Sequence, residues 1–344
     1  MGTATVKVAV LVVNWNAGPL LGRCLESLAR QSRLPDRVII VDNASTDDSV
    51  DRAAAQLGGA EVIRLTENAG FARANNVGAR AAGDVDALAL LNPDAFPEPG
   101  WLAALVDAAG RSPEFAAFAS QLRLDATPDR LDGAGDSYHV SGRAWRNGHN
   151  APAANWPERE HEVFAPCAAA ALYRRAAFEE VGGFDESYFC YFEDVDLGFR
   201  LRLHGYRSLY VPSSVVRHVS SALSGYRSDF AVYHGERNSV WTFVKNMPAP
   251  LFWRYLPQHL ALNVASLFFY PLRGQGRAVW RAKWHALLGL RTVLSHRRDE
   301  QRRRQADWRT VRDAMARGPA VPYLSRYGVP PAASAETPRA EPKS

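Results

Sequence analysis

The segment LLNPDAFPEPGW, residues 90–101, decides how the chain is interpreted. It begins in the apolar run ALALL and passes into Asn92, Pro93 and Asp94. A buried strand is therefore predicted to deliver one carboxylate, on a proline-stiffened turn, at its carboxyl end. Ligands of α/β sheets bind at that edge, and a single carboxylate there suits Mg²⁺ or Mn²⁺ with positions left open for phosphate oxygens. Asp94 is the candidate metal ligand; the alternative is ordinary turn chemistry after a strand.

Two earlier apolar runs predict parallel strands. Residues 6–13 and 37–41 are β-branched and apolar, and each is followed by a polar turn and a helical pattern. Strand, helix, strand, helix in this order predicts a βαβ unit, and hence an α/β fold with a mostly parallel sheet. No GxGxxG follows either strand and no GxxxxGK[ST] occurs, which excludes the usual dinucleotide and P-loop sites.

Polar side chains near these strand ends are candidates for holding a nucleotide. Asp42 ends the second strand, where a carboxylate can accept hydrogen bonds from a ribose hydroxyl or a base N–H. Its alternative role is in a loop that caps the next helix. A third strand, residues 61–65, leads to ENAGFARANNVG, a glycine turn into a helix whose amino end is expected to face the pocket. Arg73 is the candidate phosphate contact there.

A second acidic cluster lies in YFCYFEDVDLGFRL, residues 188–201. Glu193, Asp194 and Asp196 fall within four residues at a predicted helix start, framed by aromatic residues. Like charges and apolar neighbours raise carboxyl pKa values, which gives at least one of them a proton affinity suited to a general base; the alternative is simple helix capping. After a last strand at residues 208–212, His218 ends the run VVRH and is a candidate metal ligand or a structural histidine.

Residues 125–162 differ from the rest because they are rich in Gly, Pro, Asn and Asp and show no sustained period. A long irregular segment in a compact domain is commonly a functional loop. We expect it to enclose bound substrate; alternatively, its aromatic residues cover the core.

Composition limits the class of protein. With 344 residues and 47% hydrophobic content, the chain can bury a large core. No apolar run reaches the roughly 18 residues of a membrane-spanning helix, and the start resembles a strand more than a cleaved signal. The three cysteines are far apart without a CxxC pair, so neither a disulfide framework nor a zinc site is expected. These features favour a cytoplasmic protein.

Together the segments resemble inverting glycosyltransferase family 2, and especially its bacterial rhamnosyltransferase-like branch. The matching pieces run in the family's order from about residue 6 to 245 and are VVNWN, VDNASTD, ENAGFARANNVG, LLNPDA, VGGFDESYFCYFEDVDLGFRLRLHGY and VVRH. The resemblance implies a GT-A nucleotide-diphospho-sugar-binding fold, with a mostly parallel central sheet flanked by helices. It also implies a nucleoside diphosphate sugar donor, with thymidine diphosphate rhamnose the leading choice, and a glycan or polyprenyl-linked glycan acceptor.

The resemblance also assigns roles to single residues. It implies that Asp42 contacts the nucleobase or ribose and that Asp94 occupies the metal-binding position of the family's DxD motif. His218 would complete the metal site, and Asp194, beside Glu193, would be the catalytic base. The donor-binding candidates are Asn14, Asp42, Asn68, Arg73 and Asn92. Asn92 stands where many members have the first aspartate, which implies weaker metal affinity.

From residue 248 the character of the chain changes. Between Arg273 and Arg312 twelve Lys or Arg face three acids, a local charge of +9 in a chain of net charge +5. Apolar and aromatic stripes flanked by arginine predict a helical appendage. It is expected to lie on the anionic inner face of the cell membrane; the alternative is that it packs on the catalytic domain or on a second subunit. Nucleic-acid binding is not expected, since no recognised module accompanies the arginines.

The sequence therefore predicts three regions: a catalytic domain (1–247), a basic amphipathic helical region (248–324) and a disordered tail (325–344). The leading hypothesis is a metal-dependent inverting glycosyltransferase of cell-surface polysaccharide synthesis. The alternatives are a nucleotidyltransferase and a catalytically inactive nucleotide-sugar-binding scaffold at the membrane.

Overall fold

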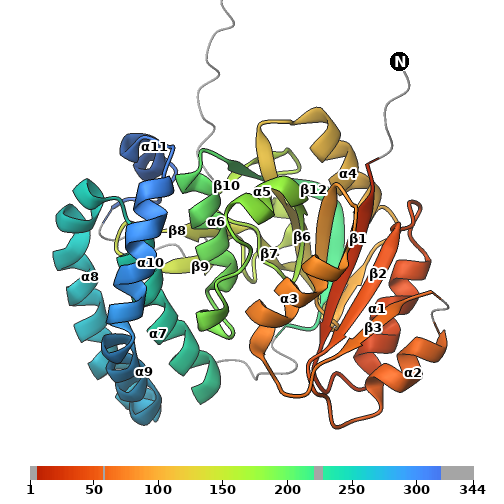
Figure 1. The fold of residues 1–344 in the computed structure, drawn as a ribbon, viewed down its shortest axis with the longest axis horizontal. Helices are drawn as coiled ribbons and strands as arrows, with labels where there is room; N and C mark the ends of the chain where they lie inside the picture. The colour runs from red at the N-terminus through yellow and green to blue at the C-terminus, as the bar shows by residue number, and fades with distance from the viewer. Residues whose placement is uncertain (1–5, 57–58, 221–227, 319–344) are drawn as a thin grey trace, which may run out of the picture.

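A central sheet with helices on both faces forms the core of the computed structural model (Figure 1), which describes residues 6–56, 59–220 and 228–318. Within these ranges the sheet has ten strands. Their order is β10-β12-β6-β11-β4-β1-β2-β3, with β5 paired to β12 and β7 to β6. The expected tail, residues 325–344, lies outside the described residues.

The amino-terminal half of the sheet is parallel, as the sequence predicted. Its strands are β1 (Val8–Asn14), β2 (Arg37–Asp42), β3 (Glu61–Arg64) and β4 (Ala87–Leu91). The helices between them are α1 (Pro19–Ala29), α2 (Ser49–Gln56) and α3 (Gly70–Ala81). Because the strands are parallel, their carboxyl ends meet at one edge of the sheet. This edge therefore collects the polar residues that follow the apolar runs.

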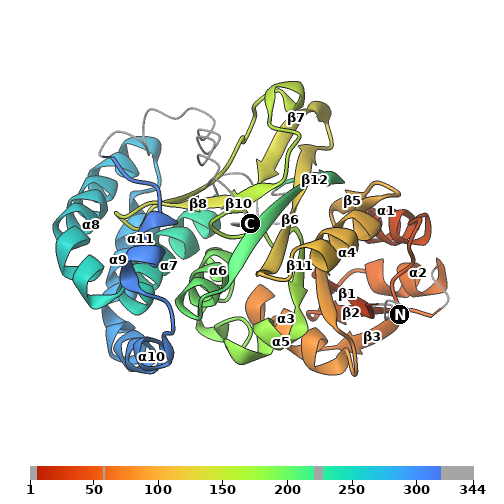
Figure 2. The same ribbon diagram turned by 90° about the horizontal axis from the view of Figure 1, so that it is seen from above.

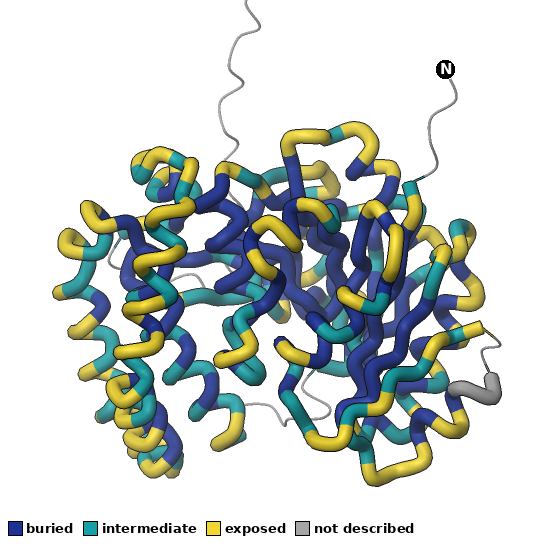
Figure 3. The backbone as a smooth tube through the Cα atoms, viewed as in Figure 1, coloured by how far each residue is buried: buried dark blue, intermediate teal, exposed yellow. Residues whose placement is uncertain are grey.

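Alternate residues of β1 build the two sides of the core, because successive side chains of a strand point to opposite faces. Val8, Val10 and Val12 pack with α1 and α4 (Trp101–Arg111). Ala9, Leu11 and Val13 pack with α3, α5 (Arg175–Glu180) and α6 (Glu193–Leu203). The central strands are accordingly buried throughout (Figure 3).

The second half of the sheet is mixed. β11 (Ala170–Arg174) lies antiparallel between β4 and β6 (Phe115–Leu124). β12 (Arg207–His218) runs parallel to β6 and pairs at its end with β5 (Ala95–Pro97). The separate last strand expected at residues 208–212 is thus part of one longer strand, which continues past a register shift between Val211 and Val215.

The irregular segment expected at residues 125–162 contains several short elements, so that expectation was wrong. They are β7 (Thr127–Ala134), β8 (Asp136–Tyr138), β9 (Ala144–Arg146), η1 (Ala153–Asn155) and β10 (His161–Val163). Pairing with β6, with β12 and between β8 and β9 creates these strands. β8, β9 and β10 have three residues each, too few to show a period of two, and exposed and buried positions do not alternate along β7, which is why the pattern gave no signal.

The carboxyl-terminal part is helical, which confirms the expected appendage. Its elements are α7 (Asp229–Asn246), α8 (Ala249–Phe269), η3 (Pro271–Arg273), α9 (Gly276–Leu288), α10 (Leu290–Arg303) and α11 (Trp308–Asp313). These helices stand together on one side of the sheet (Figure 2). Phe243, Met247 and Leu251 pack with Phe199 and Leu203 of α6, so the appendage shares a core with the rest of the chain. Across the described ranges, no helix is both long and apolar enough to cross a bilayer.

A buried ion network joins α7 to α6. Lys245 Nζ lies 2.5 Å from Asp185 Oδ2 and 2.8 Å from Asp196 Oδ1. Asp196 Oδ2 in turn accepts a 2.8 Å hydrogen bond from Nε of Arg200. The side chains of Lys245 and Asp196 are 2% and 0% exposed. Burial would raise the pKa of Asp196, but Lys245 and Arg200 outweigh it and lower that pKa, so the carboxylate stays charged.

We expect Lys245→Met to lower the free energy of unfolding by about 3–5 kcal/mol, because it leaves two carboxylates buried without their shared cation. Urea denaturation followed by circular dichroism measures this change. Lys7→Met is the matched control, since the Lys7 side chain is 58% exposed. A loss below about 1 kcal/mol, the value typical of surface pairs, would contradict the structural role of the network.

Candidate active site

A cavity of about 690 Å³ opens at the carboxyl edge of the parallel strands. Its walls come from segments far apart in sequence: the end of β1, the turn after β4, the start of α3, the β8–β9 region, the segment before β11, and the loop that leads into α6. The predicted residues Asn68, Asn92, Asp94, Glu193, Asp194 and His218 all line it. One pocket therefore brings together the two acidic motifs and the late histidine.

Strand register brings Asp94 and His218 together. Asp94 closes the turn after β4, and the next residue, Ala95, is the register partner of His218 across the β5–β12 pair. His218 Nε2 consequently lies 3.2 Å from Asp94 Oδ1. Both side chains are nearly fully buried, with 3% and 5% of their surfaces exposed. Two potential metal ligands, 124 positions apart in sequence, thus share one wall of the cavity.

Asp132 fixes the orientation of this histidine. Asp132 Oδ2 lies 2.7 Å from His218 Nδ1 and 2.5 Å from Nη1 of Arg146. Burial would raise the pKa of Asp132, but Arg146, His149 and His218 outweigh it and hold the carboxyl well below its usual pKa. Asp132 is therefore an anion that binds the Nδ1 side of the imidazole and leaves Nε2 facing Asp94 and the cavity.

The two carboxylates also change the proton affinity of His218. Burial would lower its pKa, but Asp94 and Asp132 outweigh this effect and raise the pKa to about 9. Burial would likewise raise the pKa of Asp94, whereas His218 outweighs it and lowers that pKa. The two carboxylates thus create a strong negative potential around His218. A metal cation bound by Asp94 and by neutral His218 would take the place of the proton on the imidazole.

The unsatisfied atoms of this wall fit a divalent cation. Asn92 Oδ1 and His218 Nε2 are both buried without a hydrogen-bond partner among the described residues, although Nε2 is close to Asp94 Oδ1. Buried polar atoms without partners are costly and rare. A carboxylate oxygen, an amide oxygen and an imidazole nitrogen are ligands that Mn²⁺ accepts, and Mg²⁺ accepts the oxygens. These three residues are the ones that would hold the ion.

Glu193 and Asp194 occupy the first turn of α6, as predicted. Asp194 Oδ2 accepts a 3.2 Å hydrogen bond from the Ala168 N–H, and Oδ1 accepts one of 2.8 Å from the Val195 N–H. Burial raises the pKa of both carboxyls above the ordinary range, and the charge of Asp194 raises that of Glu193 further. Asp196, the third acid of the cluster, points into the ion network with Lys245 and does not line the cavity.

The loop before α6 is held in a strained conformation. Phe189, Tyr191 and Phe192 have φ angles of 65°, 66° and 68°, a region that side chains other than glycine rarely adopt. Asn238 of α7 maintains it: its Nδ2 donates to the carbonyl oxygens of Tyr188, Cys190 and Tyr191. Strain of this kind persists only where the surroundings fix it, and it is typical of active sites.

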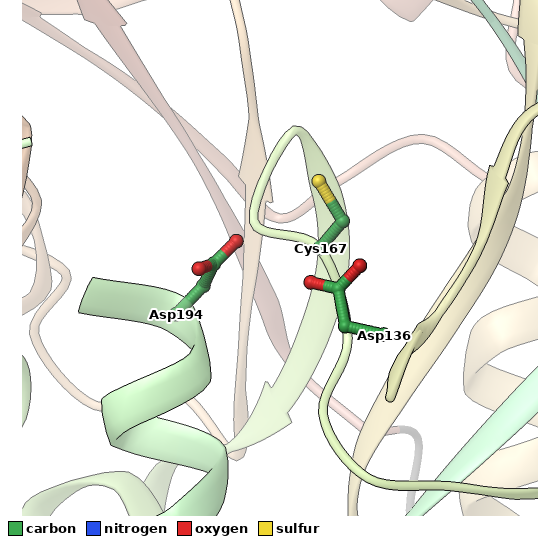
Figure 4. Close-up of side chains that lie close together, drawn as sticks. All are labelled: Asp136, Cys167 and Asp194. Carbon is green, nitrogen blue, oxygen red and sulfur yellow. The ribbon is translucent and has the colours of Figure 1, made fainter. Parts of the chain in front are cut away.

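Asp136 and Cys167 lie beside Asp194 (Figure 4). One ligand-type atom from each of the three side chains lies within 4.8 Å of the others. Burial raises the pKa of Asp136 and Cys167, and the charge of Asp194 raises both further. These groups therefore favour their protonated forms, which suits a site of proton transfer better than a site for a metal ion.

The donor-binding candidates fall into two groups. Asn68 and Asn92 line the cavity, and so does Gly70 at the start of α3. Among the described residues, the cavity wall does not include Asn14, Asp42 or Arg73. The Asp42 carboxylate accepts from the Ser45 N–H at 3.0 Å and lies 3.2 Å from Nη1 of Arg64.

The remaining two candidates have other neighbours. The amide of Asn14 donates to the hydroxyls of Ser45 and Ser49. Arg73 is half exposed and lies 3.7 to 3.8 Å from Glu67 and Glu186. Direct donor contacts from Asn14, Asp42 and Arg73 remain predictions.

Sequence reasoning missed several residues of the site. Besides Asp132, these are the cavity-lining residues Trp15, Asn43, Asp136, Arg146, Cys167, Phe189, Tyr191 and Phe230. Asp132 and Asp136 lie in LDGAGD, within the segment treated as a loop, and the sequence does not show that these two acids are buried. Trp145 lines the cavity, whereas Tyr138 and Trp156 belong to the core, so each alternative for the aromatic residues holds for part of the segment.

Comparisons with known proteins agree with this geometry. The model of the family described as "Glycosyltransferase like family 2" matches residues 5–241. The N-acetylglucosaminyl-diphospho-decaprenol L-rhamnosyltransferase of Mycobacterium tuberculosis is 31% identical over 287 residues, which cover 72% of this chain and 89% of that protein.

Two solved structures share the fold. GalNAc-T7 with UDP, GalNAc and Mn²⁺ has a TM-score of 0.60 at 16% identity, over 76% of this chain and 52% of that one. The mannosyltransferase PcManGT from Pyrobaculum calidifontis with GDP-Man and Mn²⁺ has a TM-score of 0.54 at 20% identity, over 86% and 84%.

We expect Asp132→Asn to weaken Mn²⁺ binding about 10- to 100-fold, the usual effect of removing the partner that orients a metal-ligating histidine. Titration of Mn²⁺ followed by electron paramagnetic resonance measures the affinity. Asp129→Asn is the matched control, because Asp129 is exposed on the same strand. Equal Mn²⁺ affinity in wild type and Asp132→Asn would show that His218 does not depend on this carboxylate.

Proposed function

The chain belongs to glycosyltransferase family 2, and from that membership we propose that it moves a sugar from a nucleoside diphosphate donor to a glycan hydroxyl, inverting the anomeric carbon. One observation carries the proposal: Asp94 with His218, and Asp194 at the start of α6, line the same cavity. A cation site and a carboxylate base in one pocket are the two groups that a direct displacement of a diphosphate needs. We assign this chemistry to residues 1–247.

In this proposal the donor diphosphate lies at the carboxyl edge of β1 and β4. Asn92, Asp94 and His218 would hold a Mg²⁺ or Mn²⁺ ion, which when bound supplies positive charge to the departing diphosphate. The amino end of α3 at Gly70 lines the same cavity, and the helix dipole places partial positive charge at that end. Trp15 and Asn68 line the cavity where the nucleoside would lie, and Asn43 fixes Asn68 by donating a 2.9 Å hydrogen bond to its Oδ1.

Asp194 performs the proton transfer. Its carboxylate removes the proton of the acceptor hydroxyl while the hydroxyl oxygen forms a bond to the anomeric carbon and the carbon–oxygen bond to the diphosphate breaks. Because the oxygen arrives from the face opposite the leaving group, the configuration inverts. Burial raises the pKa of Asp194, which makes it a stronger base than an exposed aspartate.

The relative from Mycobacterium tuberculosis supports a finer assignment. Its name gives an L-rhamnosyl donor and a lipid-linked N-acetylglucosaminyl acceptor. We propose that this chain uses thymidine diphosphate rhamnose and a polyprenyl-linked glycan, in synthesis of a cell-surface polysaccharide. It would act in the cytoplasm at the inner face of the membrane, where such an acceptor is held.

Two other functions compete with this one. A scaffold that only binds nucleotide sugars would not need two carboxylates in the cavity wall at a helix start, so Glu193 with Asp194 argues against it. A nucleotidyltransferase would need groups that grip a nucleoside triphosphate, such as an early glycine-rich basic loop, and the segment after β1 (residues 15–18) contains no Lys or Arg.

We expect Asp194→Asn to lower kcat about 10²- to 10⁴-fold, because the amide cannot accept the proton. The assay measures radiolabelled sugar transferred from thymidine diphosphate rhamnose to a polyprenyl-diphospho-N-acetylglucosamine, with donor affinity measured separately by calorimetry. Asp107→Asn, an exposed acid of α4, is the control. Full turnover in Asp194→Asn, with the same donor affinity, would remove Asp194 from the base role.

A further inference from the structure

The helices α8 and α9, with η3 between them, expose an unusual apolar surface. Of the fourteen large hydrophobic side chains exposed in the described ranges, ten lie between residues 249 and 288. We call these ten side chains the apolar surface: Trp253, Leu260, Val264, Phe268, Phe269, Leu272, Trp280, Trp284, Leu287 and Leu288. Their clustering on consecutive elements separates them from scattered exposed hydrophobics, which need no explanation.

The outer face of α8 is apolar along its whole length. Trp253, Leu260, Val264 and Phe268 recur at helical spacing and are 70%, 54%, 54% and 68% exposed. The opposite face is buried: Leu251 packs with Phe243 and Met247. A helix at the surface of a soluble protein normally turns polar side chains to water. The exposed side of α8 therefore needs a partner other than water.

α9 also has a buried apolar side and an exposed apolar side. Ala278, Val279 and Ala282 are buried, and Val279 packs with Val232 of α7. Trp280 and Trp284, on the other side of the same helix, are 57% and 61% exposed. In Figure 3 the outer turns of α8 and α9 accordingly carry many exposed positions. The helix therefore has two apolar sides. The buried side packs on α7, and the exposed side indicates a partner outside the described residues.

The charge of this region selects the partner. Residues 249–288 contain five Lys or Arg and no Asp or Glu. Arg254, Arg273, Arg277 and Arg281 are exposed, and the Arg273 guanidinium lies 4.4 Å from the Phe269 ring centre. A second copy of the chain would bring the same cations against them, whereas an anionic lipid surface would neutralise them. Trp and Phe with arginine on one face are typical of helices that lie in the membrane interface.

The apolar surface is connected to the cavity through α7. Phe230, in the first turn of α7, lines the cavity, and Val232 and Tyr233 contact α9 through Val279 and His285. In Figure 1, the carboxyl end of α8, the start of α7 and the carboxyl ends of β1 and β2 all lie at the lower side of the molecule. A membrane that covers the end of α8 would thus lie on the side where the cavity opens.

We infer that the apolar surface of α8, η3 and α9 docks the protein on an anionic membrane, with the aromatic side chains in the interface and the arginines against lipid phosphates. This inference rests on the proposed function, because docking on that side would present a lipid-linked acceptor to the base Asp194. It adds the surface, the orientation and the chemistry of the lipid.

Flotation of the purified full chain with phosphatidylcholine vesicles, with and without phosphatidylglycerol, tests the inference. We expect wild type to float with the anionic vesicles. The double variant Phe268→Glu with Trp284→Glu should lose about tenfold or more in the bound-to-free ratio, because each substitution removes an aromatic ring from the apolar interface. Arg277→Gln should weaken binding to anionic vesicles and leave any binding to neutral ones unchanged. Leu34→Glu, a substitution at a side chain 63% exposed outside this surface, should float like wild type.

Two outcomes would overturn the inference. One is wild type that stays at the bottom of the gradient with anionic vesicles; the other is a stable dimer by light scattering that Phe268→Glu dissociates, which would assign the surface to a second copy. Thermal melting of every variant detects misfolding. Transfer to a short-chain, water-soluble acceptor should be equal in wild type and the double variant. Floating protein without any transfer would refute the proposed function and leave the docking intact.

Discussion

A carboxylate buried in a protein must be compensated by a cation, a proton or hydrogen bonds, and this constraint governs the carboxyl edge of the sheet. Six acids around the cavity show this: Asp94, Asp132, Asp136, Glu193 and Asp196 are buried, and Asp194 is partly buried. Each is compensated differently. Arg146 and His218 neutralise Asp132, Lys245 and Arg200 neutralise Asp196, and protons neutralise Asp136 and Glu193, whose pKa values burial raises. Asp94 is paired with His218, and Asp194 accepts hydrogen bonds from two backbone N–H groups; these are the two residues to which we assign the chemistry.

The same constraint separates three acids that are adjacent in sequence. Helix geometry turns Asp196 away from Glu193 and Asp194, toward α7, where the Lys245 ammonium holds it charged. The helices that carry the apolar surface are thereby attached to the helix that carries the base. α7, the last helix of residues 1–247, makes this link, since it contributes Lys245 to the network, Asn238 to the strained loop and Phe230 to the cavity, and packs on α9 through Val232.

Local pattern was sufficient for part of the fold and site. The apolar runs of β1, β2 and β4 predicted a parallel sheet, and with it the placement of Asp94 at the carboxyl edge. The acids before LGFRL predicted the start of α6. Asp132 was not predictable, because it reaches His218 only through the pairing of β7 with β6 and of β6 with β12; Arg146 in turn reaches Asp132 from β9. Nor did sequence show that Arg64 and Ser45 occupy the Asp42 carboxylate, a contact that depends on strands β2 and β3 lying side by side.

The central claim is that the cavity binds a nucleoside diphosphate together with a divalent cation held by Asp94. Thermal denaturation with thymidine, uridine or guanosine diphosphate, with and without Mn²⁺, tests it most directly, because a ligand of the folded state raises the melting temperature by mass action. The account predicts a rise that is selective for one nucleotide, requires Mn²⁺ and disappears in Asp94→Asn. No rise with any nucleotide, or a rise that persists in Asp94→Asn without Mn²⁺, would contradict it.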